Sequence, residues 1–144
     1  MQAFTQALLD CPIYMEVPAG YSVHDGKLAF SGETNRNTDK SFVLKLLKNI
    51  YGLKQAGYNW YNKLTDELFK AGFRQSAVNK CLFIRDDCII IVYVDDCLLF
   101  SQSDTVLDEM LTLLNQQFKI TSSHSIENYL GLEVSKSVDN VITL

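Results

Sequence analysis

Residues 81–101 read CLFIRDDCIIIVYVDDCLLFS and carry the clearest signal of the fold. Short apolar runs rich in Ile, Val, Phe and Leu, separated by polar turn residues, are typical of strands joined by tight turns. The polar interruptions are two Asp-Asp pairs, Asp86-Asp87 and Asp95-Asp96. We therefore expect three short antiparallel strands, with one Asp-Asp pair at each connection.

Two segments flanking these strands have the spacing of amphipathic helices. Residues 58–71 end at Gly72, and Trp60 recurs with other apolar residues on one face. Residues 105–118 form the second predicted helix, with a start at Thr105 that resembles a capping box. Further strands are predicted at residues 28–30, 42–46, 129–136 and 141–144. Together these elements predict an α+β fold, an antiparallel sheet with helices packed on one face.

Length and composition describe one globular domain. The chain has 144 residues, of which 47% are hydrophobic and 21% charged, which is not the balance of a disordered chain. No apolar run approaches the roughly 20 residues that span a bilayer. No basic residue precedes the first apolar cluster, so we expect neither a membrane span nor secretion. Residues 22–41 are polar and rich in Gly, Asn, Ser and Thr, which predicts an exposed connecting loop.

Charge is distributed unevenly along the chain. The formal net charge is −4, but nine of the 13 Lys and Arg residues and only two of the 17 Asp and Glu residues lie within residues 40–85. This segment therefore carries +7 and the remainder −11. A basic segment can bind phosphates even in an acidic protein. The alternative, ordinary solvated lysines on helix surfaces, remains open on charge alone.

The second Asp-Asp pair has unusual surroundings. Asp86-Asp87 follows Arg85 and needs no explanation beyond a turn, whereas Asp95-Asp96 lies between the most apolar runs of the chain. Two carboxylates about 5 Å apart repel by roughly 3 kcal/mol at an effective dielectric constant near 20. That cost is avoided if both face water and offset if they hold a divalent cation such as Mg²⁺. Spacing alone leaves both interpretations open.

Four short segments together resemble one protein family. Tyr93-Val94-Asp95-Asp96 within an apolar hairpin resembles the catalytic box of reverse transcriptases. Residues 14–21 (YMEVPAGY), 50–56 (IYGLKQA) and 129–134 (YLGLEV) are similar, in the same order, to the Ty1/copia retrotransposon branch of that family. Because the boxes cover nearly the whole chain, residues 1–144 are identified as a partial, truncated reverse transcriptase domain. It would have a polymerase palm-like core with part of the fingers.

The resemblance implies an activity, RNA-directed DNA polymerisation. Two Mg²⁺ ions, with Mn²⁺ as an alternative, would promote attack of a primer 3′-hydroxyl on an incoming deoxynucleotide. By similarity, the catalytic and metal-binding residues are Asp95 and Asp96, the nucleotide-binding residues Phe4, Lys54 and Gln55, and the template–primer residues Tyr93, Leu130 and Gly131. Implied partners are an RNA template, a DNA primer, deoxynucleoside triphosphates and the rest of a Pol polyprotein with integrase and RNase H. The expected location is intracellular, in a cytoplasmic virus-like particle or the nucleus.

The same residues also have purely structural interpretations. The turn at residues 52–56 can be a simple strand-to-helix connection, and Gly131 can mark a strand bend or bulge. We interpret Trp60 and Tyr61 as core anchors of their helix rather than as base-stacking platforms.

The first catalytic box of the family is only partly present. It has the form Asp-x-x-x-Ala-Phe, and Ala3-Phe4 match its end, so its aspartate would fall two positions before Met1. We therefore expect the chain alone to be an impaired or inactive polymerase. One alternative is a non-enzymatic, transposon-derived nucleic-acid-binding remnant. Another is a domain without any nucleic-acid role, in which both Asp-Asp pairs are turns.

Overall fold

The protein is an α+β chain, as the sequence predicts. A computed structural model describes residues 3–30, 42–123, 126, 128–133, 135–136 and 142–143. In chain order the elements are η1 (Phe4–Gln6), β1 (Tyr14–Glu16), β2 (Tyr21–His24), β3 (Lys27–Phe30), β4 (Val43–Lys45), α1 (Ala56–Lys70), β5 (Arg74–Gln75), β6 (Leu82–Arg85), β7 (Cys88–Tyr93), β8 (Asp96–Phe100), α2 (Asp104–Gln117), β9 (Asn128–Tyr129), β10 (Leu132–Glu133), β11 (Ser135–Lys136) and β12 (Ile142–Thr143).

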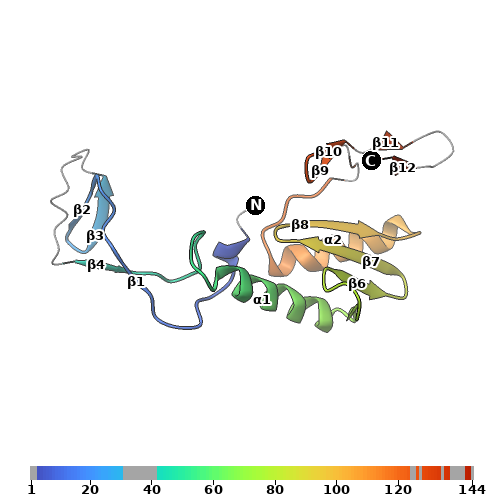
Figure 1. The fold of residues 1–144 in the computed structure, drawn as a ribbon, viewed down its shortest axis with the longest axis horizontal. Helices are drawn as coiled ribbons and strands as arrows, with labels where there is room; N and C mark the ends of the chain where they lie inside the picture. Colours follow the sequence, from blue (N-terminus) through green and yellow to red (C-terminus); the bar gives the residue numbers. More distant parts are fainter. Residues whose placement is uncertain are drawn as a thin grey trace.

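The central sheet is an antiparallel meander in the order β5-β6-β7-β8 (Figure 1). The three strands predicted from residues 81–101 are confirmed as β6, β7 and β8, while the edge strand β5 was not expected. The first connection is Asp86-Asp87, as predicted, but the second is Val94-Asp95. Asp96 belongs to β8, where it pairs with Tyr93. The second turn therefore lies one residue earlier than its Asp-Asp pair suggested.

One hydrophobic core joins the sheet to both helices. Along β7, Cys88, Ile90 and Val92 are buried, while Ile89 and Tyr93 are exposed, the period-2 pattern of a half-buried strand. The same core contains Leu64 and Leu68 of α1, Met110 and Leu114 of α2, and Phe73, Phe83 and Phe118. In Figure 1, α2 runs beside β7 and β8.

The helices differ from expectation only at their ends. Helix α1 begins two residues earlier than predicted, at Ala56, and Gly72 follows it with φ +86°, the left-handed conformation that often terminates helices. Helix α2 begins at Asp104 and its N-cap is Ser103 rather than Thr105, so the predicted capping box is wrong. Asp104 in the first turn puts a negative charge at the positive end of the helix dipole.

Two small strand pairs precede the central sheet. β1 pairs with β4, and β2 pairs with β3; both lie at the opposite end of the molecule from the sheet (Figure 1). Of the predicted connecting loop at residues 22–41, the first nine residues lie in the largely exposed β2–β3 hairpin and the turn within it. Residues 31–41 lie outside the described residues. The longest helix in the described part of the chain, α1, has 15 residues, fewer than a membrane-spanning helix requires.

The C-terminal segment is more finely divided than the sequence suggested. Instead of one strand at residues 129–136, β9 and β10 form a hairpin around Leu130-Gly131. Both turn residues have positive φ, +51° for Leu130 and +82° for Gly131. Two consecutive positive φ values are the requirement of a type I′ hairpin turn, which glycine accepts without steric cost. The chain therefore reverses at Gly131 instead of bending.

A buried asparagine connects the N-terminal segment to the entrance of α1. The side chain of Asn49 is fully buried, and its Nδ2 donates to the carbonyls of Ala7 at 3.1 Å and Leu8 at 2.8 Å. Its Oδ1 accepts from Asn59 Nδ2 at 3.3 Å. Lys63 Nζ adds a bond to the carbonyl of Gln6 at 2.7 Å. These contacts hold η1 against α1.

Replacing this asparagine should destabilise the chain. Asn49→Ala removes the donor to two main-chain carbonyls at a buried site, so we expect the free energy of unfolding to fall by about 1–3 kcal/mol. Urea unfolding followed by circular dichroism measures the change. Asn115→Ala, the same substitution on the exposed face of α2, is the control and should cost nothing. Equal effects of the two substitutions would contradict the structural role of Asn49.

Candidate active site

The predicted catalytic residues lie at the tip of the β7–β8 hairpin. Val94 and Asp95 form its two-residue loop, and Tyr93 and Asp96 are the last paired residues. Val94 has φ +56°, a conformation that is rare for a β-branched residue and costs on the order of 1–3 kcal/mol. Asp95, at intermediate exposure, and the exposed Asp96 thus follow a strained residue.

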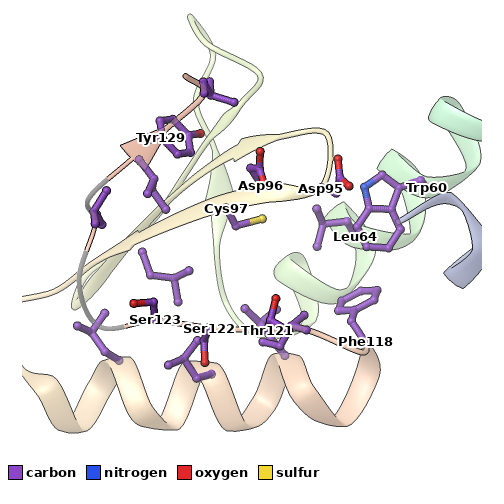
Figure 2. A pocket seen from close by; sticks show the side chains of 18 of the residues that line it. Trp60, Leu64, Asp95, Asp96, Cys97, Phe118, Thr121, Ser122, Ser123 and Tyr129 are labelled. Atoms are coloured by element: carbon purple, nitrogen blue, oxygen red, sulfur yellow. The ribbon is translucent and has the colours of Figure 1, made fainter. Parts of the chain in front are cut away.

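A pocket of about 640 Å³ opens beside this hairpin (Figure 2). Its walls come from α1, the β7–β8 hairpin, α2, the segment that follows α2 and the β9–β10 hairpin. The lining includes Trp60, Leu64, Asp95, Asp96, Cys97, Leu98, Leu99, Leu107, Leu111, Thr121, Ser122, Tyr129 and Leu130. Figure 2 shows Asp95 and Asp96 along one side, with Trp60 next to Asp95. The two carboxylates are thus charged groups on one edge of a mostly apolar cavity.

A tyrosine links two of the predicted site residues. Tyr51 Oη donates to Asp95 Oδ2 at 3.4 Å, across 44 positions of sequence. The ring of Phe4 lies against Tyr51, with ring centroids 4.4 Å apart and planes tilted by 47°. Loss of hydration and then the neighbouring Asp95 charge raise the pKa of Tyr51, so it stays a donor at neutral pH. Tyr51 brings Phe4 and Asp95 to one place, and sequence reasoning did not single it out.

A second link runs from helix α1 to the hairpin loop. Trp60 Nε1 donates to the carbonyl oxygen of Val94 at 2.6 Å. The Trp60 ring is 3% exposed and packs edge-on against Phe118, so its prediction as a core anchor is confirmed. Tyr61 is only partly buried, and its hydroxyl donates to the carbonyl of Lys80 at 3.4 Å. The helical spacing of apolar residues in the sequence predicts that Trp60 is buried. It does not predict which group accepts the hydrogen bond of the indole N–H.

Lys54 and Gln55, predicted to bind nucleotide, lie in the turn that leads from Tyr51 into α1. Lys54 is exposed, and Gln55 is the N-cap residue of the helix. Gly52 in the same turn has φ +97°, which glycine adopts freely. This turn reaches the β7–β8 hairpin through Tyr51, the residue directly before Gly52.

The residues predicted to contact template and primer do not all line the pocket. Tyr93 is 55% exposed beside Asp96, and Leu130 lines the pocket. At Gly131 an added Cβ would meet no described residue within 4 Å. Tyr129 Oη is buried and makes no hydrogen bond within the described part of the chain. Burial, followed by electrostatic interaction with Cys97 and then Asp96, raises the pKa of Tyr129.

The donor set at the hairpin suits a hard cation. Carboxylate oxygens of Asp95 and Asp96 beside open space fit Mg²⁺, which takes one or two carboxylates and completes its shell with water and phosphate. Burial raises the pKa of the Cys97 thiol to about 11, so it is protonated at neutral pH and a poor ligand. Among the described residues, no cluster of three or more His, Cys, Asp or Glu side chains could hold a metal.

The other Asp-Asp pair is engaged differently. Asp87 receives both a 2.5 Å bond from Arg85 Nε and a 3.1 Å bond from Arg85 Nη2. These hydrogen bonds and the guanidinium charge hold the pKa of Asp87 below its usual value. The prediction of a plain turn at Asp86-Asp87 is confirmed. Asp87 and Asp95 occupy the same position of two neighbouring hairpin loops but have different partners.

Comparisons with known proteins agree on one family. The family model described as "Reverse transcriptase (RNA-dependent DNA polymerase)" matches residues 1–144. The Retrovirus-related Pol polyprotein from transposon RE1 of Arabidopsis thaliana is 33% identical over 138 residues, which are 93% of this chain and 8% of that polyprotein. The putative transposon Ty5-1 protein of Saccharomyces cerevisiae is 30% identical over 146 residues, covering 99% of this chain and 43% of that protein.

A third relative extends the set to Ty1. The Transposon Ty1-DR5 Gag-Pol polyprotein of Saccharomyces cerevisiae is 33% identical over 100 residues, which are 64% of this chain and 6% of the polyprotein. The chain thus spans less than half the length of each of these three relatives. No solved structure gives a significant match. The match over the full chain and the nature of the relatives show that this protein belongs to the reverse transcriptase family, in its Ty1/copia retrotransposon branch.

Proposed function

We propose that the chain is the palm-like core, with part of the fingers, of an RNA-directed DNA polymerase of a copia-type retrotransposon. The observation that carries the proposal is the contact of Tyr51 with both Asp95 and Phe4. This contact brings three sequence boxes together at one side of the β7–β8 hairpin, although they lie far apart in the chain. In a polymerase these boxes must meet, because metal, nucleotide and primer react at one point.

In this proposal the hairpin carboxylates bind the divalent ions. Asp95 would hold them directly, and Asp96 would add negative charge beside it. When bound, the ions activate the primer 3′-hydroxyl and stabilise the leaving pyrophosphate. The strained loop at Val94 keeps both carboxylates at the hairpin tip, where open space beside them leaves room for phosphate oxygens.

The remaining predicted residues would position the substrates. Phe4, stacked on Tyr51, would crowd the 2′ position of the sugar, and Lys54 and Gln55 would contact the incoming nucleotide. Tyr93 and the backbone of Leu130-Gly131 would contact template and primer. No described residue lies within 4 Å of an added Cβ at Gly131, which would let a nucleic-acid strand come close.

The proposed partners follow from this reaction. They are an RNA template, a DNA primer, deoxynucleoside triphosphates and the other parts of a Pol polyprotein, integrase and RNase H. The reaction would take place inside the cell, in a cytoplasmic virus-like particle or in the nucleus.

Metal binding should be confined to one of the two hairpin loops. On titration with Mg²⁺, we expect backbone chemical-shift changes centred on Asp95 and Asp96, because these carboxylates do not share the guanidinium partner of Asp87. Asp95→Asn should weaken Mg²⁺ binding at least about tenfold, since it removes one of two charged ligands. Asp87→Asn, at the equivalent loop position, is the matched control and should leave the affinity unchanged. Shifts centred on Asp87 instead would refute the metal site.

Polymerisation by the isolated chain should be very weak or absent. We propose that the two carboxylates of this chain do not suffice for two metal ions, since removing a direct ligand from a catalytic metal site costs orders of magnitude in rate. Primer extension on an RNA template with Mg²⁺ tests this. We expect no more product than from Asp95→Asn. Extension that Asp95→Asn abolishes would support the polymerase assignment and overturn the inactivity.

A second candidate function is a nucleic-acid-binding remnant without catalysis. The observation in its favour is that Lys45, Lys48 and Lys54 are all exposed within the basic part of the chain. Such a remnant would bind primer–template through phosphate contacts and perform no synthesis.

Binding of primer–template should depend on these lysines and on salt. Changing all three lysines to Glu should weaken binding of every primer–template sequence tested. The slope of log affinity against log salt concentration should become shallower by about 1 for each lysine that contacts a phosphate. Fluorescence anisotropy at several salt concentrations measures both. Lys119→Glu, an exposed lysine outside the basic segment, serves as control. An absence of binding at low salt would remove this alternative.

A further inference from the structure

We propose that Trp60 is a positioning residue for the metal-binding turn. Its indole N–H holds the carbonyl of Val94 and so fixes the hairpin loop in the conformation that presents Asp95 and Asp96. The inference rests on the proposed function, which makes these two carboxylates the metal site. It adds a residue from another element to that site.

The loop requires an external hold because its conformation is unfavourable. Val94 has φ +56°, and such strain persists only where the surroundings over-determine it. Packing of the Val94 side chain does little to hold this conformation, since the residue is 46% exposed. The pair Tyr93–Asp96 fixes the two ends of the loop but not the orientation of the peptide group in its middle.

That middle peptide is the group that Trp60 holds. The indole Nε1 lies 2.6 Å from the carbonyl oxygen of Val94, and Figure 2 shows the indole nitrogen on the side of Trp60 that faces Asp95. Because a peptide unit is planar, fixing this oxygen also fixes the direction of the N–H of Asp95. Asp95 is therefore held at its backbone by Trp60 and at its carboxylate by Tyr51.

Trp60 is itself held rigidly. Its ring is 3% exposed and meets Phe118 edge-on, with centroids 5.3 Å apart and planes at 75°. It lies one helical turn after Ala56, the first residue of α1, and directly before that residue comes Gln55, which we propose binds nucleotide. The indole thus connects the loop of the metal site to the helix that begins at the nucleotide-binding turn.

The N–H can be removed while the ring is kept. Trp60 is the sole tryptophan of the chain, so growth with a tryptophan analogue that carries sulfur in place of the indole N–H changes this position alone. We expect Mg²⁺ affinity to fall about five- to tenfold and amide exchange at residues 94–96 to quicken by a similar factor, the worth of one hydrogen bond. Thermal unfolding should move little, because the buried ring remains.

Phe83→Leu separates positioning from packing. Phe83 is fully buried in the same core and its ring contacts Phe69, so the melting temperature should fall while Mg²⁺ affinity, measured where the chain is folded, stays unchanged. Unchanged exchange at residues 94–96 in the sulfur analogue would overturn the inference. So would an equal loss of Mg²⁺ affinity in Phe83→Leu. If the unsubstituted chain does not bind Mg²⁺, the proposed function is refuted instead. The amide exchange rates of residues 94–96 then still test whether the Trp60 hydrogen bond fixes the loop.

Discussion

The pairing of β7 with β8 through a two-residue loop is the constraint on which the rest of the site depends. Because side chains alternate along a strand, the burial of Cys88, Ile90 and Val92 fixes which residues face the core. A slip of one residue would turn these side chains to solvent and move the loop away from Val94-Asp95. The hydrophobic core therefore sets the register, and the register sets the place of the two carboxylates.

Contacts from distant parts of the chain then complete the site. Asn49 holds the N-terminal segment, which brings Phe4 to Tyr51. Tyr51 and Trp60, on either side of the turn that enters α1, reach Asp95 and the carbonyl of Val94. Each of these bonds is modest in free energy, about 1 kcal/mol. Together they join the N-terminal segment, the turn before α1 and the hairpin, which is the arrangement that the proposed metal and nucleotide site requires.

Most of the secondary structure could be predicted because its signals are local. The strands β6, β7 and β8 and both helices follow from apolar periodicity within short windows. The capping box at Thr105 and the second turn at Asp95-Asp96 were wrong by one or two residues, since propensity fixes such boundaries weakly. The turn at Leu130-Gly131 was missed because a positive φ at leucine has no signal in the sequence.

The family, the α+β class and the positions of the boxes that match the family follow from the sequence. Which of those boxes meet, and through which side chains, follows only from the folded structure. Tyr51 and Asp95 are 44 positions apart, and Trp60 and Val94 are 34 apart. The physical reason is that periodicity and turn chemistry act between near neighbours in the chain. Contacts across such distances form only when the whole core closes and places one side chain against another.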